Sequence, residues 1–508
     1  MVGAVEMAGF SAKWVYEYLK KQAESGIENH ALLIMQGNDI VFEEYNYPYS
    51  ADMPHTLFSV TKSIASTAAG FAVSEGLLSL DTRIDEIFEG YEKCKGSGWE
   101  NLTLRSVLTM NSNKKFTFLQ DMTADYNTIF MEADFRKKGG FLYSNNDAHI
   151  VAAAVQKLSG QSLTEYLTPR LFEPLGIEVP FWETNEAGEC IGGTGCYLKA
   201  RDLAKICRCY ADGGKYNGKQ VIPEFWCREA TKIQHQFKEN EGYGYLFWIK
   251  NGIFSMTGMF GQLVSYIPQY DTVLVSLNSC IAEGMNSSLA ESVLMKAFAE
   301  ESTAEDEKIL ENYLKSRRLK IPSCEKLPPV HEGKEYYITA VSDAIAKVLF
   351  PQSVIPRTLT CSFAKRPKSN PDKVSFSLKD NALNISWLEE EDKVTISCGL
   401  DGEPRMSECV IKGYPYKIWA YCYTEGDKFK LVVKPLNTLA THYIDLEFKP
   451  DAVKMSFKSN PCFTEFILKS AMEPEFFNKH RLVRTVTQGV VKLVVDTTAR
   501  PVKFRLKK

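Results

Sequence analysis

The period of the hydrophobic pattern changes near residue 300, and this change limits the folds that the chain can adopt. Before it, helical stretches alternate with short strand-like runs. After a charged segment and three prolines, apolar and polar residues mostly alternate in short runs, as they do in half-buried strands. A length of 508 residues leaves room for two to four domains. The sequence therefore predicts two parts of different class, a mixed α+β body followed by an all-β part.

The predicted domain boundaries follow that change. Residues 1–303 are expected to form the α+β body, and residues 304–331 a linker helix with a proline-containing connector. Residues 332–508 are expected to form a C-terminal all-β domain, barrel-like or lipocalin-like. In the body, Ala31–Tyr45 has the pattern of two strands around a turn, and Ser59–Glu75 that of an Ala-rich helix closed by glycine. Two further helices are expected at Asn145–Leu158 and Ser287–Ala299.

Short alternating runs dominate the C-terminal part. Val374–Leu378 and Leu383–Trp387 flank the turn sequence KDNA, which is typical of a β-hairpin. The aromatic residues between Tyr414 and Tyr423 alternate with a one-residue slip, which predicts a β-bulge in a core strand. Further runs with the same alternation occur at Lys393–Leu400, Tyr414–Tyr423, Phe429–Lys434, Tyr443–Phe448, Val453–Phe457 and Val490–Val495. So many strands in series predict an antiparallel barrel or sandwich.

Composition argues against several classes of function. Sixty Lys and Arg against 63 Asp and Glu give a formal net charge of −3, so there is no basic surplus to attract nucleic acid. No apolar run is long enough to cross a bilayer, and Met1–Phe10 lacks the basic residues and the length of a signal peptide. We therefore expect a cytoplasmic protein that has neither a nucleic acid nor a membrane as partner.

The spacing of cysteine and histidine gives no support for a metal site. The thirteen Cys include no C-x-x-C pair, the nearest neighbours being Cys207 and Cys209, and none of the seven His are spaced H-x-x-x-H. An odd and scattered set of thiols favours reduced, mostly buried side chains over a disulfide framework. The chemistry must therefore come from ordinary side chains.

A Ser-x-x-Lys tetrapeptide is the strongest candidate for that chemistry. A serine hydroxyl is a weak nucleophile until a nearby base takes its proton. Residues three apart on a helix share a face, so Ser59 and Lys62 would form a compact pair of nucleophile and base. The spacing alone is weak evidence, because three other pairs have it: Ser112 with Lys115, Ser323 with Lys326, and Ser362 with Lys365.

The sequence that follows Ser59 distinguishes it from the other three. The stretch IASTAAGFAVSEGLL is apolar on nearly every side of a helix, so Lys62 is expected to be buried. Burial of an ammonium group lowers its pKa, which suits a general base at neutral pH. The N-terminus of the helix also brings backbone N–H groups close to Ser59, where they can stabilise developing negative charge. The other three pairs lie in polar loops or in the strand-rich part.

Two sequence motifs resemble those of a known family and follow each other in the same order as in that family. Residues 57–63, LFSVTKS, with 75–81, EGLLSLD, resemble the nucleophile helix of serine β-lactamases and penicillin-binding proteins. A second motif of that family, Tyr-x-Asn, is matched only by Tyr143-Ser-Asn145. The resemblance covers roughly residues 10 to 300 and is greatest to the branch of class C β-lactamases, DD-peptidases and esterases. It implies a β-lactamase-like body, that is, an antiparallel sheet flanked by helices together with a helical subdomain.

The third family element departs from the usual pattern. The family carries Lys-Thr-Gly or His-x-Gly on a strand along the edge of the site, and Met256-Thr257-Gly258 stands at this place. The family's cation is therefore replaced by Met256. In members that recognise β-lactams, that cation helps to hold the substrate carboxylate. Its absence weakens a β-lactamase or peptidoglycan hypothesis and favours the esterases and amide hydrolases of the family.

The resemblance implies a role for each motif residue. Ser59 would attack an ester or amide carbonyl of a small molecule, and Lys62 and Tyr143 would take its proton. Asn145 would orient Lys62 and the substrate. The backbone N–H groups of Ser59 and Met259 would form an oxyanion hole beside Thr257 and Gly258. No metal or organic cofactor is implied.

Other classes of function stay open at this point. A DD-peptidase or β-lactamase would use the same site, and so would an acyltransferase, in which an alcohol or amine replaces water. A binding protein that has kept the fold with an inactive site is a further alternative. The C-terminal domain contains no family motif, and it could narrow the cleft or join subunits into a homo-oligomer.

Three further candidates have simpler structural explanations. His55 precedes Ser59 by four residues but lies before the helix, so we expect a structural role for it. The acidic pair Asp85-Glu86 and the acidic run at residues 389–392 are expected to be solvated charges.

Overall fold

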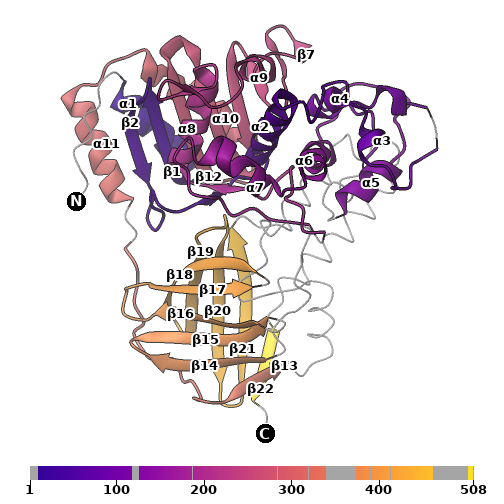
Figure 1. The fold of residues 1–508 in the computed structure, drawn as a ribbon. Helices are drawn as coiled ribbons and strands as arrows, with labels where there is room; N and C mark the ends of the chain where they lie inside the picture. The colour runs from indigo at the N-terminus through magenta and orange to yellow at the C-terminus, as the bar shows by residue number, and fades with distance from the viewer. Residues whose placement is uncertain are drawn as a thin grey trace, which may run out of the picture. The chain divides into compact units, whose positions relative to one another are not determined.

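The computed structural model describes residues 10–95, 97–116, 125–185, 187–282, 284–317, 320–338, 373–389, 392–411, 413–460 and 502–506. These residues form two compact units (Figure 1). The described residues up to 317 belong to the first unit, and those from 320 onward belong to the second. The predicted boundaries at residues 303 and 331 stay predictions.

An eight-stranded sheet forms the centre of the first unit. Its strand order is β2-β1-β12-β11-β10-β9-β8-β7, and the pairings between neighbours are antiparallel. The strands are β1 (Glu28–Gln36), β2 (Asp39–Tyr45), β7 (His235–Lys238), β8 (Glu241–Tyr243), β9 (Trp248–Lys250), β10 (Ile253–Gly258), β11 (Gln262–Ile267) and β12 (Thr272–Ser279). Every residue of β12 is buried, because this strand lies inside the sheet and both of its faces are covered.

Helices pack on both faces of this sheet. Alternate residues of β1 point to opposite faces: Leu32 and Ile34 join the core under α1 (Ala12–Glu24), and Leu33 and Met35 join the core on the other side. The first face is also covered by α10 (Met285–Ser292) and α11 (Ala304–Ser316). The second face is covered by α2 (Val60–Ser74) and α8 (Ala200–Ala211). The three-layer arrangement is visible in Figure 1.

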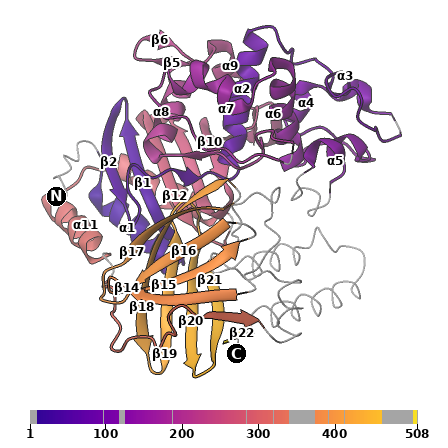
Figure 2. The ribbon, with the colours of Figure 1, turned by 60° about the horizontal axis from the view of Figure 1, so that its bottom comes forward.

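A group of shorter helices extends from α2 beside the sheet (Figure 2). Its centre is α6, which packs against α2 and is surrounded by small helices. These elements are α3 (Ile84–Ile87), α4 (Leu104–Leu108), α5 (Tyr126–Glu132), α6 (Asn145–Ser159) and α7 (Leu163–Leu167). The unit also contains α9 (Glu224–Ala230) and the two-residue strands β3 (His55–Thr56), β4 (Tyr197–Leu198), β5 (Lys215–Tyr216) and β6 (Lys219–Gln220).

The helix predictions for this unit hold with one difference. The predicted helices at Ser59–Glu75 and Asn145–Leu158 correspond to α2 and α6. The helix predicted at Ser287–Ala299 is interrupted, because α10 ends at Ser292 and a 3-10 turn spans Leu294–Phe298. The predicted linker helix is α11, which packs on α1 within the first unit.

The second unit is a closed antiparallel sheet of ten described strands. Its order is β16-β15-β14-β13-β22-β21-β20-β19-β18-β17, and an additional contact between β16 and β18 closes it. Inward-facing residues alternate along each strand, as Val394, Ile396 and Cys398 do. The strands are β13 (Glu335–Ile338), β14 (Lys373–Lys379), β15 (Ala382–Glu389), β16 (Asp392–Gly399), β17 (Arg405–Ile411), β18 (Tyr414–Glu425), β19 (Lys428–Pro435), β20 (Thr441–Lys449), β21 (Ala452–Asn460) and β22 (Val502–Leu506). The predicted fold class, an α+β body followed by an antiparallel barrel-like domain, is confirmed.

The predicted β-bulge is wrong. Strand β18 pairs with β17 and with β19 in an unbroken register. The aromatic residues therefore lie on opposite faces of one regular strand, Tyr416 on one and Trp419 and Tyr421 on the other. All three are buried, which removes the need for a local irregularity. The run predicted at Val490–Val495 lies outside the described residues.

Several negative observations apply to the described residues. None of their helices combines the length and the apolar character that a membrane span requires. They contain no group of three or more His, Cys, Asp or Glu side chains that could hold a metal ion. The eleven described Cys carry free thiols, and most of them are buried. A cytoplasmic location stays a prediction.

A buried histidine pair holds the segment that leads into α2. His55 Nδ1 lies 2.8 Å from the carbonyl oxygen of Thr56, so this nitrogen must carry the proton. His55 Nε2 then accepts from His30 Nδ1, also at 2.8 Å. Burial lowers the pKa of His55 from 6.5 to about 4.

Acid should therefore destabilise the first unit. In the unfolded chain His55 takes up a proton below pH 6.5, whereas in the folded chain it does so only near pH 4. The neutral His55 therefore contributes fully to the free energy of unfolding above pH 6.5, and this contribution is lost as the pH falls toward 4. We expect a loss of roughly 3 kcal/mol of unfolding free energy over this range. Denaturant titrations between pH 7 and 4 measure it, with His331→Gln as an exposed control. A His55→Gln variant with the wild-type pH dependence would contradict this origin.

Candidate active site

Ser59 lies at the N-terminal end of α2, and the residues before it are fixed to a distant segment. Strand β3 pairs with β4, and the N–H of Leu57 donates to the carbonyl of Cys196 at 3.1 Å. Phe58 then adopts a positive φ of 48°, a left-handed conformation that turns the chain sharply into the helix. Ser59 is partly exposed although the residues on both sides of it are buried. The geometry presents its hydroxyl at the surface of a packed core.

Lys62 is held beneath this hydroxyl. Its side chain is 1% exposed, as its place on an apolar helix predicted. Its Nζ lies 2.7 Å from Ser59 Oγ, 2.6 Å from Asn145 Oδ1 and 2.7 Å from the carbonyl oxygen of Gly193. The sequence-predicted Ser59, Lys62 and Asn145 are therefore brought together.

The partners of Lys62 fit a base that takes a proton from serine. The oxygens of Asn145 and Gly193 can only accept, so each of them takes one N–H group of Lys62. A neutral amine has two N–H groups, and its lone pair is then left for the Ser59 hydroxyl. After proton transfer, the third N–H of the ammonium group would donate to the same Oγ. One set of contacts thus accommodates both protonation states.

The Tyr-x-Asn motif is positioned by a helix cap. The hydroxyl of Ser144, the middle residue, accepts from the N–H groups of Asn146 and Asp147 and so begins α6. Asn145 is consequently the first residue of the helix, with its side chain on Lys62. Tyr143 lies just before the cap, and its ring centroid is 4.9 Å from Lys62 Nζ. The motif therefore places both side chains beside the lysine.

Gly193 is a site residue that the sequence did not reveal. Its carbonyl is the third partner of Lys62. A Cβ at this position would come within 3.0 Å of the Asn145 backbone and Cβ, a tight contact that favours glycine. The preceding Gly192 is even closer to α6, where an added Cβ would lie 2.4 Å from Ala152 Cβ. The Gly192-Gly193 pair in the sequence could have indicated close backbone packing at this point. It could not have indicated which element the backbone packs against.

The end of β10 forms a second border of the site. An added Cβ at Gly258 would lie 2.3 Å from the carbonyl oxygen of Leu57, so this glycine lets β10 approach the entrance to α2. Thr257, Gly258 and Met259 are all partly exposed. Met256, in the place of the family's cation, is 1% exposed and packs in the hydrophobic core. In this chain the side chain at position 256 therefore contributes to the hydrophobic core.

Phe58 and Phe260 connect the two borders of the site. Phe58 has a φ of 48° and Phe260 a φ of 64°. Phe58 precedes Ser59 and Phe260 follows Met259, the two residues proposed for the oxyanion hole. Their rings pack edge to face with centroids 5.1 Å apart, and both are buried. Within the described part of the chain, the N–H of Ser59 donates to no backbone carbonyl. The contact fixes the backbone at Ser59 relative to that at Met259.

The other Ser-x-x-Lys pairs do not form comparable sites where the structure describes them. Ser112 is buried and donates to Asp147 at 2.8 Å, while Lys115 is exposed. Ser323 and Lys326 are both exposed. The pair at residues 362 and 365 lies outside the described residues.

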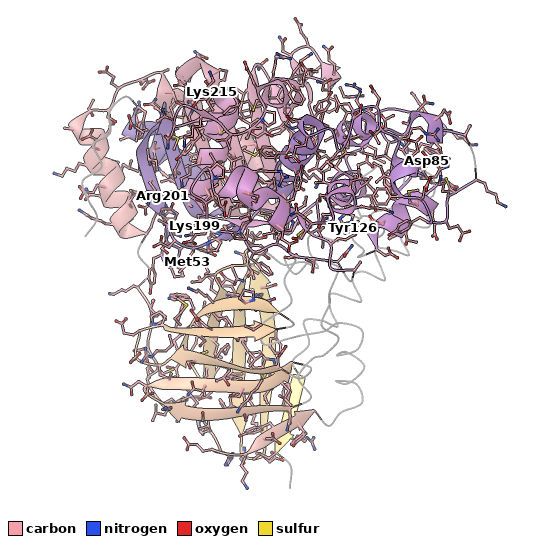
Figure 3. The ribbon with its side chains drawn as sticks, viewed as in Figure 1. Met53, Asp85, Tyr126, Lys199, Arg201 and Lys215 are labelled. Carbon is pink, nitrogen blue, oxygen red and sulfur yellow. The ribbon has the colours of Figure 1, made fainter. Side chains whose placement is uncertain are left out.

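The remaining candidates also have defined places. His55 bonds to His30, in agreement with the structural role predicted for it. Asp85, labelled in Figure 3, is not the solvated charge predicted from sequence, because it is 7% exposed. It pairs with Arg83 at 2.8 Å and with Lys93 at 3.1 Å. These cations lie on the surface of the helical group and explain how the carboxylate tolerates burial.

The fold and this arrangement define a serine hydrolase. A partly exposed serine stands at the start of a buried helix and contacts a buried lysine in an α+β body. The family model for Beta-lactamase matches residues 15–279, and the chain belongs to that family. The resemblance predicted from the three motifs is thus confirmed.

Individual relatives are distant. A 6-aminohexanoate-dimer hydrolase of Paenarthrobacter ureafaciens is 24% identical over 290 residues, which are 49% of this chain and 72% of that protein. The solved structure of EstCE1, a hydrolase with promiscuous acyltransferase activity, is 14% identical with a TM-score of 0.47 and covers 56% of this chain and 98% of its own. The octameric penicillin-binding protein homologue from Pyrococcus abyssi is 17% identical with a TM-score of 0.46 and covers 88% of this chain and 98% of its own.

Proposed function

We propose that this enzyme hydrolyses an ester or amide bond of a small molecule through an acyl-enzyme on Ser59. The observation that supports this most strongly is the 2.7 Å contact between Lys62 Nζ and Ser59 Oγ. The amine also has two carbonyl oxygens to hold its N–H groups, so it is aligned for one proton transfer.

In the proposed first step, Ser59 Oγ attacks the substrate carbonyl carbon while its proton passes to the neutral amine of Lys62. The carbonyl oxygen becomes an anion that accepts from the backbone N–H groups of Ser59 and Met259. The C–O or C–N bond to the leaving group then breaks, Tyr143 gives its phenolic proton to this group, and Lys62 passes the serine proton on to Tyr143. Water repeats the sequence on the acyl-enzyme and frees Ser59.

The substrate class is narrowed by Met256. The thioether is buried in the core, so at this position the site has no cation for a substrate carboxylate. This favours neutral esters and amides over β-lactams and peptidoglycan-type peptides. The relative from Paenarthrobacter ureafaciens is named as a hydrolase of the 6-aminohexanoate dimer, which is consistent with amide cleavage here.

Neutral acyl donors should accordingly be better substrates than β-lactams. We expect p-nitrophenyl acetate and butyrate to give kcat/KM values at least about 100-fold above that of a chromogenic cephalosporin, since a buried unmatched carboxylate costs about 3 kcal/mol. Initial-rate measurements with both classes on one enzyme preparation test this. Efficient cephalosporin hydrolysis would contradict the hypothesis and restore the β-lactamase or DD-peptidase alternative.

Covalent labelling tests the proposed nucleophile directly. A fluorophosphonate should add one equivalent to the protein, and peptide mass spectrometry should locate the adduct on Ser59. An adduct on Ser112 or Ser323 would contradict the assignment. Addition of an alcohol acceptor during ester turnover would reveal whether acyl transfer competes with hydrolysis.

None of the residues assigned to these steps belongs to the second unit. We propose that it joins copies of the chain into a homo-oligomer, since it contributes none of the motifs of the site. Size-exclusion chromatography with light scattering of the full chain measures the association state.

A further inference from the structure

Five aromatic side chains form a continuous cluster that begins at Tyr143, and we call it the aromatic wall: Phe141, Tyr143, Phe237, Tyr243 and Trp248. The rings of Tyr143 and Trp248 stack with centroids 5.5 Å apart and an angle of 28°. Trp248 also meets Tyr243 edge to face at 4.9 Å. Phe141 contacts Phe237 at 4.8 Å and Tyr243 at 5.2 Å. The wall is therefore one connected set of rings.

The sheet explains why these rings meet. In the register of the antiparallel strands, Trp248 of β9 is the partner of Ser255 of β10 and of Tyr243 of β8. Strand β10 continues beyond Ser255 to the partly exposed end at Thr257 and Gly258. Three of the rings thus lie on β9, β8 and β7, the strands that follow β10 in the sheet, and the other two lie just before α6.

The two ends of the wall differ in their surroundings. At one end, the ring of Tyr143 lies 4.9 Å from Lys62 Nζ, which bonds to Ser59. At the other end, Phe237 is 41% exposed, and Trp248 and Phe141 are partly exposed. Tyr243 alone is fully buried and belongs to the core. Packing of the core explains the aromatic ring at Tyr243. It does not explain why Phe237, Phe141 and Trp248 keep part of their apolar surface exposed.

We propose that the aromatic wall binds the leaving group of the substrate, and that this group is a flat, apolar arylmethyl alcohol or amine. The inference rests on the proposed function, in which Tyr143 gives its proton to the leaving group. A leaving-group atom within reach of Tyr143 has the stacked ring of Trp248 directly beside it. A ring attached one carbon further on would continue along Trp248 toward Phe237.

Matched esters separate this specificity from chemical reactivity. 2-Naphthylmethyl acetate and 2-methoxyethyl acetate form the same acetyl-enzyme and release primary alcohols of similar acidity. We expect kcat/KM for the naphthylmethyl ester to be about 10-fold higher, as one or two aromatic contacts would give. Methyl 2-naphthylacetate carries the ring on the acyl side, so its kcat/KM should not exceed that of 2-methoxyethyl acetate. Equal values for the two acetates, or a preference for the acyl-side ring, would overturn the inference.

A Phe237→Ser variant tests the wall itself. Phe237 contacts Phe141 and Trp248 and has no ring contact with Tyr143, so the catalytic groups stay in place. The variant should lower kcat/KM for the naphthylmethyl ester about 5-fold through KM and leave the methoxyethyl ester unchanged. Leu158→Ser is the matched control, since Leu158 is also 41% exposed and lies on α6. An equal loss on both esters would indicate a structural role and overturn the proposal.

The two proposals fail in different ways. If a fluorophosphonate labels Ser59 and the acetates are hydrolysed without an aryl preference, only the leaving-group inference is wrong. If Ser59 stays unlabelled and no ester is hydrolysed, the proposed function fails and the inference fails with it.

Discussion

Replacement of Ser59 by alanine should abolish turnover and covalent labelling while the protein stays folded. The variant lacks the hydroxyl that lies 2.7 Å from Lys62 Nζ and is proposed as the nucleophile, so we expect kcat to fall by a factor of about 10⁵ or more. The side chain is partly exposed and donates no bond that holds the core, so unfolding free energy should change by less than about 1 kcal/mol. Ester hydrolysis, phosphonate labelling and thermal unfolding measure the three quantities.

The chain provides a matched control for this variant. Ser323→Ala makes the same chemical change at an exposed Ser-x-x-Lys pair in the second unit. It should leave turnover and labelling at wild-type values. Retention of labelling by Ser59→Ala, or its loss in Ser323→Ala, would show that the nucleophile is elsewhere.

Replacement of Lys62 by arginine should cause the second largest loss. A guanidinium keeps its proton at all accessible pH values and cannot serve as the base. It is also too large for a position that is 1% exposed and surrounded by Ser59, Asn145 and the Gly193 carbonyl. We expect kcat/KM to fall by about 10² to 10⁴, the usual contribution of a general base. Steady-state kinetics as a function of pH measure the loss.

Folding must be checked for the same variant, because Lys62 is buried. Circular dichroism and thermal unfolding of Lys62→Arg would show whether the site is intact, and Lys62→Met removes the charge with less bulk. Lys115→Arg is the control, since Lys115 is exposed and belongs to a Ser-x-x-Lys pair that is not a site. Substantial turnover by a folded Lys62→Arg protein would mean that Tyr143 alone acts as base.

The core of the site could be predicted from sequence because it consists of local motifs. Ser59 and Lys62 share one helical turn, and Asn145 begins a helix with its own cap residue, so short spacings encode their geometry. The burial of Lys62 followed from the apolar sequence around it. Its third partner could not be predicted, since any residue offers a carbonyl and only the fold decides that Gly193 is the one.

The aromatic wall shows a second limit of sequence analysis. Phe141, Phe237 and Trp248 come from three separate segments: the pairing of short strands brings Phe237 and Trp248 together, and tertiary packing adds Phe141. In the second unit, strands and their alternation were predictable because their period of two is strong. The bulge was not, because a slip in aromatic spacing is equally compatible with a regular strand that is buried on both faces.

The contact between Phe58 and Phe260 joins two segments that are synthesised at different times. About 200 residues separate the two in the sequence, so a ribosome synthesises Ser59 long before Met259, the second residue proposed for the oxyanion hole. A nascent or truncated chain that stops before β10 carries Ser59 and Lys62 but has nothing to fix the second N–H group. Under the proposed function, we therefore expect ester hydrolysis to begin only after the segment from β10 onward has been synthesised and has folded.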